Sequence, residues 1–171
     1  MPSFQTLRHV PHRPEAMLEL VADVERYPQF LPLCESLKVL SRSRAADGSE
    51  VIVAHMGVGY GPLRENFTSR ITINRQTYQI DVSHLDGPFR VLDNRWRFAA
   101  ARGGCDVAFD INYEFRSLTL QLLLGSLFDR AFRKFAEAFE TRARAVYGVA
   151  GITASAENQV PGASQALRSV S

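Results

Sequence analysis

Residues 118–147 read LTLQLLLGSLFDRAFRKFAEAFETRARAVY. Large apolar side chains recur here at steps of three, four or seven residues, the spacing of one face of an α-helix. These positions are Leu120, Leu124, Phe128, Phe132, Phe135, Phe139 and Val146. A stripe that includes four phenylalanines needs a large apolar partner. We therefore predict one long helix that lies across a concave surface.

The sequence before this helix changes to a period of two. Alternating apolar and polar residues, separated by short turns that contain glycine, predict strands at 36–44, 50–59, 63–74, 77–85, 89–101 and 105–115. A first strand is expected at 4–10, and a helix from Pro14 to about Tyr27. Strands followed by one long helix indicate an α+β fold. We expect a curved antiparallel sheet wrapped on the long C-terminal helix, with a cavity between them.

Composition places the chain among ordinary globular proteins. Of its 171 residues, 46% are apolar and 22% charged, and no stretch is long and apolar enough to span a membrane. The net charge of +2 predicts no nucleic-acid partner. Two cysteines, Cys34 and Cys105, do not make a disulfide framework. We expect one domain over residues 1–148 and a disordered tail over 149–171, which holds no aromatic residue.

No set of residues predicts catalysis or metal binding. None of the four histidines is spaced with another histidine or a cysteine as metal ligands are. Nothing in the sequence places Cys34 beside a histidine as a nucleophile pair would require. We therefore predict neither catalytic nor metal-ligating residues.

Several short motifs then suggest a family. They are YPQFLPLC at 27–34, FTSR at 67–70, GPF at 87–89, WRF at 96–98, FDINYEF at 109–115 and AFETRA at 138–143. In this order and spacing they resemble the Coq10-type coenzyme Q-binding proteins. The wider group is the START-like, polyketide cyclase/dehydrase superfamily, and the resemblance implies its helix-grip fold.

The resemblance also implies a function. Coq10-type proteins bind ubiquinone or a related lipophilic isoprenoid quinone, and act as carriers or chaperones that support respiratory electron transport and quinone biosynthesis. They are not enzymes and need no other cofactor. Eukaryotic members work in mitochondria, whereas this chain starts directly at its first strand with no transit peptide. We therefore expect a protein of the bacterial cytoplasm with peripheral contact to the inner membrane.

A quinone with an isoprenoid tail is mostly hydrocarbon, so its site should be an apolar tunnel with few polar groups. Donors such as Tyr60, Arg70 or Trp96 are candidates to orient the head group. The predicted ligand-binding residues are Phe30, Leu31, Tyr60, Leu63, Phe67, Arg70, Trp96, Leu124, Phe128, Phe132 and Phe135. The corner at 30–33 and the leucine-rich stretch 118–127 are expected to form an exposed apolar patch where lipid enters.

Two other functions remain open. Bacterial relatives of this family, the RatA type, are described as toxins that act on the large ribosomal subunit, although the low net charge gives this little support. An aromatase or cyclase enzyme on the same fold is the other alternative, and it needs an acid–base pair in the cavity. Similarity of fold alone does not decide among them.

Overall fold

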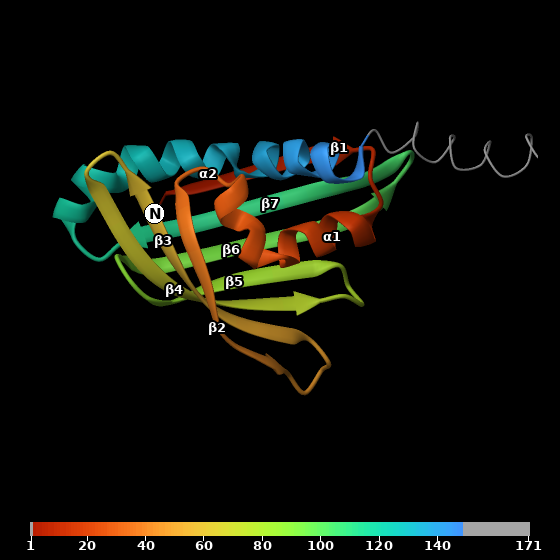
Figure 1. Ribbon diagram of the computed structural model, residues 1–171, viewed down its shortest axis with the longest axis horizontal. Coiled ribbons are helices and arrows are strands. Elements are labelled where there is room, and N and C mark those ends of the chain that lie inside the picture. The colour runs from red at the N-terminus through yellow and green to blue at the C-terminus, as the bar shows by residue number, and fades with distance from the viewer. Residues whose placement is uncertain (1, 149–171) are drawn as a thin grey trace, which may run out of the picture.

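The computed structural model describes residues 2–148. They form β1 (Ser3–Val10), α1 (Pro14–Ala22), the 3-10 helix η1 (Val24–Gln29), β2 (Cys34–Arg44), β3 (Glu50–Tyr60), β4 (Leu63–Asn74), β5 (Gln79–Asp86), β6 (Phe89–Ala101), β7 (Gly104–Phe115) and α2 (Leu118–Tyr147). Figure 1 shows α2 lying along one side of a curved sheet, with α1 and η1 at the same side. The predicted tail, 149–171, lies outside the described residues.

The strands form one antiparallel sheet of seven strands in the order β1-β7-β6-β5-β4-β3-β2. From β2 to β7 each strand pairs with the next in the chain, so the predicted meander is confirmed. β1 adds to the free edge of β7, with Phe4 opposite Ile111. Irregular pairing between β2 and β3 after Cys34 and after Val39 helps the sheet to bend, because bulges increase local twist.

Strict alternation supplies the concave apolar face of the sheet. Along β7, every second side chain from Cys105 to Phe115 is buried and the residues between them are more exposed. The paired strand β6 buries Leu92, Trp96 and Phe98 on the same side. This face needs a cover of similar size, and α2 provides it.

The long helix has the predicted bounds. Ser117 caps its N-terminus, because its hydroxyl accepts a hydrogen bond from the Leu120 N–H at 3.2 Å. Gly148 ends it with φ of 74°, a left-handed conformation that glycine adopts without strain. Leu124, Phe128, Phe132 and Phe139 are buried, as the stripe predicts, and Ala131, Ala136 and Ala143 complete the packed face.

The prediction that the last residue of the stripe is buried is wrong. Val146 is 50% exposed. At this end α2 packs through its neighbour Tyr147, whose hydroxyl donates to the Ala16 carbonyl at 3.0 Å and whose ring contacts that of His12. The element beside the last turn is thus the start of α1, and the apolar face turns toward it.

The predicted first helix divides in two. The α-helical conformation ends at Ala22, and Val24 begins the 3-10 helix that contains Pro28. Asp23, at φ −82° and ψ 68°, leaves the helical region and redirects the chain. The strand predicted from residue 77 also begins later, because Tyr78 has a φ of 55° in the preceding turn. The hydroxyl of Tyr78 therefore reaches Glu15, on α1.

Candidate functional site

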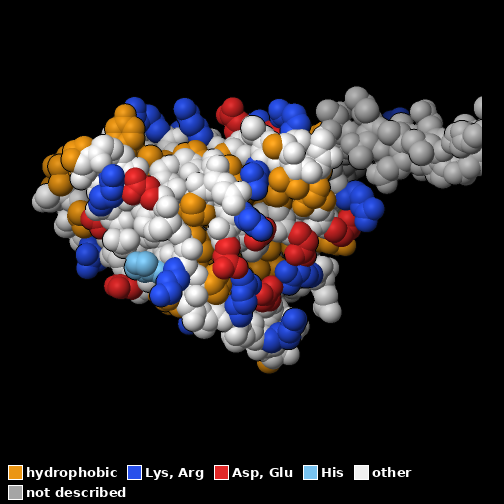
Figure 2. All heavy atoms as spheres, viewed as in Figure 1, with side chains coloured by type: hydrophobic (Ala, Val, Ile, Leu, Met, Phe, Trp, Pro, Cys, Tyr) orange, Lys and Arg blue, Asp and Glu red, His pale blue; other side chains and the backbone are white. Residues whose placement is uncertain are grey.

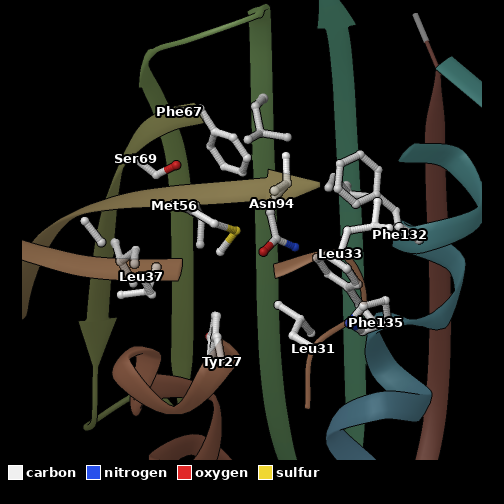
Figure 3. Close-up of a pocket in the computed structure, with 18 of the residues that line it drawn as sticks. Tyr27, Leu31, Leu33, Leu37, Met56, Phe67, Ser69, Asn94, Phe132 and Phe135 are labelled. Carbon is white, nitrogen blue, oxygen red and sulfur yellow. The ribbon is translucent and has the colours of Figure 1, made fainter. Parts of the chain in front are cut away.

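A cavity of about 80 Å³ lies between the concave face of the sheet and α2. Its walls come from η1, the 31–33 corner, strands β2 to β7 and the middle of α2. Figure 3 shows Leu37 and Ser69 on one side and Phe132 and Phe135 on the other, with Met56 and Asn94 between them. The lining is therefore assembled from segments far apart in the sequence.

The two-residue period of the strands and the helical period of α2 both direct these side chains into the same space. On β4 the alternating residues Phe67, Ser69 and Ile71 all line the cavity, because successive side chains of a strand point to opposite faces. On α2 the lining residues Phe128, Phe132 and Phe135 follow helical spacing. The cavity thus lies where the apolar stripe of the helix meets the apolar face of the sheet.

Aromatic rings close the end of the cavity near η1. The Phe139 ring lies 5.3 Å from that of Tyr27, 5.1 Å from that of Phe30 and 5.0 Å from that of Trp96, in each case edge to face. This arrangement is favourable for aromatic pairs and holds α2 against both η1 and the sheet. Phe139 is 2% exposed and so belongs to both the core and the cavity wall.

Only four lining side chains carry a polar atom, namely Tyr27, Ser69, Asn94 and Trp96. The Tyr27 hydroxyl donates to the Val21 carbonyl, and burial raises its pKa well above the ordinary value. The Trp96 indole donates to Asn94 Oδ1 at 3.0 Å, and Asn94 Nδ2 donates to the Asp110 carbonyl at 3.0 Å. Three of the four therefore already have protein partners.

A surface groove adjoins the cavity. Leu33, Val58 and Phe128 line both spaces, so these three side chains separate the interior from the groove. The outer part of the groove is made by Tyr60 and Leu63, at the β3–β4 turn, and by Leu124 and Leu127 of α2. Apolar side chains thus continue from the cavity into this groove at the surface.

The cavity is small compared with known ligand sites. Pockets that hold small molecules typically enclose about 300–1,000 Å³. A volume of about 80 Å³ has room for a few small groups but not for a quinone with its tail. A lipophilic ligand therefore requires the lining to move apart, and Leu33, Val58 and Phe128 are the side chains that must yield for a tail to leave through the groove.

Six of the predicted ligand-binding residues line the cavity. They are Leu31, Phe67, Trp96, Phe128, Phe132 and Phe135. Tyr60, Leu63 and Leu124 line the groove instead. Phe30 packs on Phe139 from outside the cavity, with the guanidinium of Arg142 5.2 Å from the centre of its ring. Contact with ligand remains a prediction for all of them.

Arg70 does not lie where a head-group donor is needed. It is exposed, whereas its neighbours Ser69 and Ile71 are buried in the cavity wall. Strand alternation therefore places Arg70 on the convex face of β4. Tyr60 is likewise 61% exposed, beyond the cavity, and the Trp96 N–H already has its partner. None of these three expected donors therefore offers a free hydrogen-bond donor to the cavity, and its other polar groups come from other residues.

Sequence reasoning did not single out Ser69, Asn94, Tyr27 or Met56, which all line the cavity. For Ser69 the signal was present, because the alternating series that predicts β4 contains it between Phe67 and Ile71. Asn94 lies two residues before Trp96 on the same face of β6, so its placement follows from that of Trp96. Tyr27 depends on the break at Asp23, which the pattern did not predict.

Within residues 2–148 no three His, Cys, Asp or Glu side chains gather as metal ligands would. Burial raises the pKa of Cys34 and of Cys105 to about 11 in each case, so both thiols stay protonated at neutral pH. Cys34 Sγ lies 3.6 Å from the Ser36 carbonyl, as a weak donor would. None of the described helices has the length and hydropathy needed to cross a bilayer.

Comparisons with known proteins agree with this architecture. Residues 10–140 match the family model described as polyketide cyclase/dehydrase and lipid transport. A START superfamily protein from Mycobacterium smegmatis has a similar structure, with a TM-score of 0.67 at 19% identity over 84% of this chain and 98% of that one. The helix-grip, START-like fold is thereby confirmed.

Two relatives carry functional names. The Rickettsia prowazekii "Ribosome association toxin RatA" is 36% identical over 85% of this chain and 99% of its own. The Xenopus laevis "Coenzyme Q-binding protein COQ10 homolog B, mitochondrial" is 33% identical over 78% of this chain and 54% of its own. Both matches therefore cover more than three quarters of this chain.

Proposed function

This chain belongs to the polyketide cyclase/dehydrase and lipid transport family, and from that membership we propose that it binds ubiquinone or a related isoprenoid quinone in its cavity. It acts as a carrier or chaperone that supports respiratory electron transport and quinone biosynthesis. The observation that carries the proposal is the lining, which is apolar apart from four side chains. The relative named as coenzyme Q-binding supports the choice of ligand.

The chemistry of the cavity suits a neutral, mostly hydrocarbon ligand. Each buried CH₂ group contributes roughly 0.8 kcal/mol, so an isoprenoid tail gains affinity from an apolar wall alone. None of the lining side chains is a carboxylate, amine, guanidinium, imidazole or thiol. A charged ligand would therefore lose its hydration without gaining an ionic partner in the described cavity, which disfavours it.

The same lining argues for binding without turnover. An aromatase or cyclase needs an acid and a base within hydrogen-bond reach of its substrate. Tyr27 and Trp96 are committed to protein acceptors, and burial raises the pKa of Tyr27, so its proton is poorly available. The cavity thus presents shape and apolar surface, which are the properties a carrier needs.

Exposed leucines at the start of α2 mark where the ligand enters. Leu118, Leu122 and Leu123 are 74%, 77% and 59% exposed. Figure 2 shows hydrophobic side chains gathered at the end of the molecule where α2 begins. Exposed Arg116 precedes the helix, and a cation beside apolar side chains suits the surface of an anionic membrane. Peripheral contact with the bacterial inner membrane at this end delivers the quinone beside the groove.

A fluorescence titration tests the proposal. The chain has one tryptophan, Trp96, and it lines the cavity. Decylubiquinone, a benzoquinone with a ten-carbon tail, should quench its emission saturably and with one ligand per chain. Quinone supplied in phosphatidylglycerol vesicles should quench it too, more slowly in Leu122→Glu than in the unaltered protein. Absence of saturable quenching with either form of quinone would contradict the proposed function.

A second function follows from the relatives named as ribosome association toxins. The Rickettsia prowazekii relative matches 85% of this chain, against 78% for the relative named for coenzyme Q, so association with ribosomes is the second candidate. Ribosomal RNA attracts proteins through phosphate contacts with Lys and Arg. The net charge here is only +2, and Arg8, Arg42 and Arg75 are each paired with a glutamate.

Co-sedimentation separates the two candidates. At physiological salt we expect the protein to remain in the supernatant when ribosomes from a bacterial lysate are pelleted through sucrose. Stoichiometric recovery with the large subunit, together with no quenching of Trp96 by quinone, would favour the second candidate over the first. A protein of similar size and charge without the START-like fold provides the background level.

A further inference from the structure

Two buried polar atoms have no hydrogen-bond partner within residues 2–148. They are the hydroxyl oxygen of Ser69 and Nδ1 of His84. Ser69 is 6% exposed and lines the cavity, and Figure 3 shows its hydroxyl oxygen near Phe67 and Met56. Buried polar groups in native proteins are nearly always hydrogen-bonded, so each exception needs an explanation.

The two atoms belong to directly opposed residues. Ser69 of β4 pairs with His84 of β5 in the sheet register, and opposed side chains on one face lie about 5 Å apart at Cβ. His84 follows the lining residues Ile80 and Val82 at steps of two, so it shares their face. The centre of its ring lies 5.9 Å from the centre of the Phe89 ring, and the two rings pack edge to face. The hydroxyl of Ser69 thus lies in the cavity wall, and the imidazole of His84 lies beside it on the same face of the sheet, just outside the lining.

The pair does not have the arrangement of a nucleophile and its base, because Ser69 and His84 do not hydrogen-bond each other. A serine hydroxyl both donates and accepts, and a neutral imidazole donates through one nitrogen and accepts through the other. Burial lowers the pKa of His84; Asp86 opposes this shift and Arg116 adds to it. The site is therefore uncharged at neutral pH and suits a neutral acceptor such as a carbonyl oxygen.

We propose that, when the lining moves apart to admit a ligand, Ser69 and His84 together form the polar end of the enlarged cavity and hydrogen-bond a carbonyl oxygen on the head of a neutral lipophilic ligand. This inference rests on the proposed function and adds to it the orientation of the bound ligand. Ser69 pairs with Ala54 on β3. Val58, which lines both the cavity and the groove, lies four residues after Ala54 on the same strand, or about 13 Å from it. The head therefore binds beside β4 and β5, and the tail leaves between Leu33, Val58 and Phe128.

Two variants and two ligands test the orientation by isothermal titration calorimetry. Ser69→Ala removes the hydroxyl, and His84→Phe removes both nitrogens but keeps a ring against Phe89. Each should weaken binding of decylubiquinone about tenfold, the loss expected for one buried hydrogen bond to a neutral group. Decylbenzene, which has the same tail and no carbonyl, should bind the unaltered protein and both variants equally.

Ser83→Ala is the matched control, because it removes a hydroxyl next to His84 from the opposite face of β5. It should bind decylubiquinone as the unaltered protein does. Retention of full affinity in both Ser69→Ala and His84→Phe overturns the inference while the proposed function stands. Equal weakening of decylbenzene also overturns it, since the loss is then one of shape. If the unaltered protein binds neither ligand, the proposed function fails together with the inference.

Discussion

Replacing Ala131 by leucine should abolish quinone binding by this protein and leave its free energy of unfolding unchanged or slightly higher. Ala131 lies on α2 between Phe128 and Phe132, is 6% exposed and lines the cavity. Leucine adds three carbon atoms to a space of about 80 Å³, so the new side chain occupies the room that the ligand must enlarge. Filling an apolar cavity restores van der Waals contacts, which offsets any strain.

The matched control is Ala136→Leu. Ala136 lies five residues further along the same helix and is 5% exposed, but it does not line the cavity. The added carbons meet packed neighbours there, and overpacking typically costs 1–3 kcal/mol. Urea unfolding and quenching of Trp96 are measured on both variants. If Ala131→Leu binds decylubiquinone as tightly as the unaltered protein, the ligand does not occupy this cavity.

Replacing Phe139 by alanine should lower the free energy of unfolding by about 3–5 kcal/mol, the range for removing a buried phenylalanine. Its ring is 2% exposed and contacts the rings of Tyr27, Phe30 and Trp96. The substitution therefore removes the contact that joins α2 to η1 and to β6 at once. Urea denaturation followed by far-ultraviolet circular dichroism measures the change.

Val146→Ala is the comparison for this second variant. Val146 belongs to the same predicted stripe but is 50% exposed, so its truncation should alter the free energy of unfolding by less than about 0.5 kcal/mol. Similar losses in the two variants would mean that Phe139 does not hold the helix to the sheet and that the described packing is incorrect.

Periodicity predicts the architecture well because burial on one face of each element generates it. The meander needs alternating residues on its concave face, as in β7, and the helix needs the spacing seen from Leu124 to Phe139. Both patterns are strong here because the sheet and helix cover each other. The prediction weakens at Asp23 and Val146, where the neighbouring element, rather than local pattern, decides the conformation.

The site was predicted less completely than the fold. The aromatic and aliphatic wall follows from the same stripe, so Phe67, Phe128 and Phe132 were found. Polar residues were chosen by chemical type, which favoured Arg70, although its strand position places its side chain on the convex face of β4, away from the cavity that Ser69 lines. A serine in an alternating apolar series has no distinctive signal until the packing shows that its hydroxyl lacks a partner.

Native mass spectrometry tests the central claim most directly. The protein is purified without detergent from a bacterium that makes ubiquinone, and its mass is recorded before and after collisional activation. The account predicts a complex with one isoprenoid quinone per chain, which releases the free lipid on activation and is lost in Ala131→Leu. A spectrum that shows only the unliganded chain, both as purified and after incubation with ubiquinone, would contradict it.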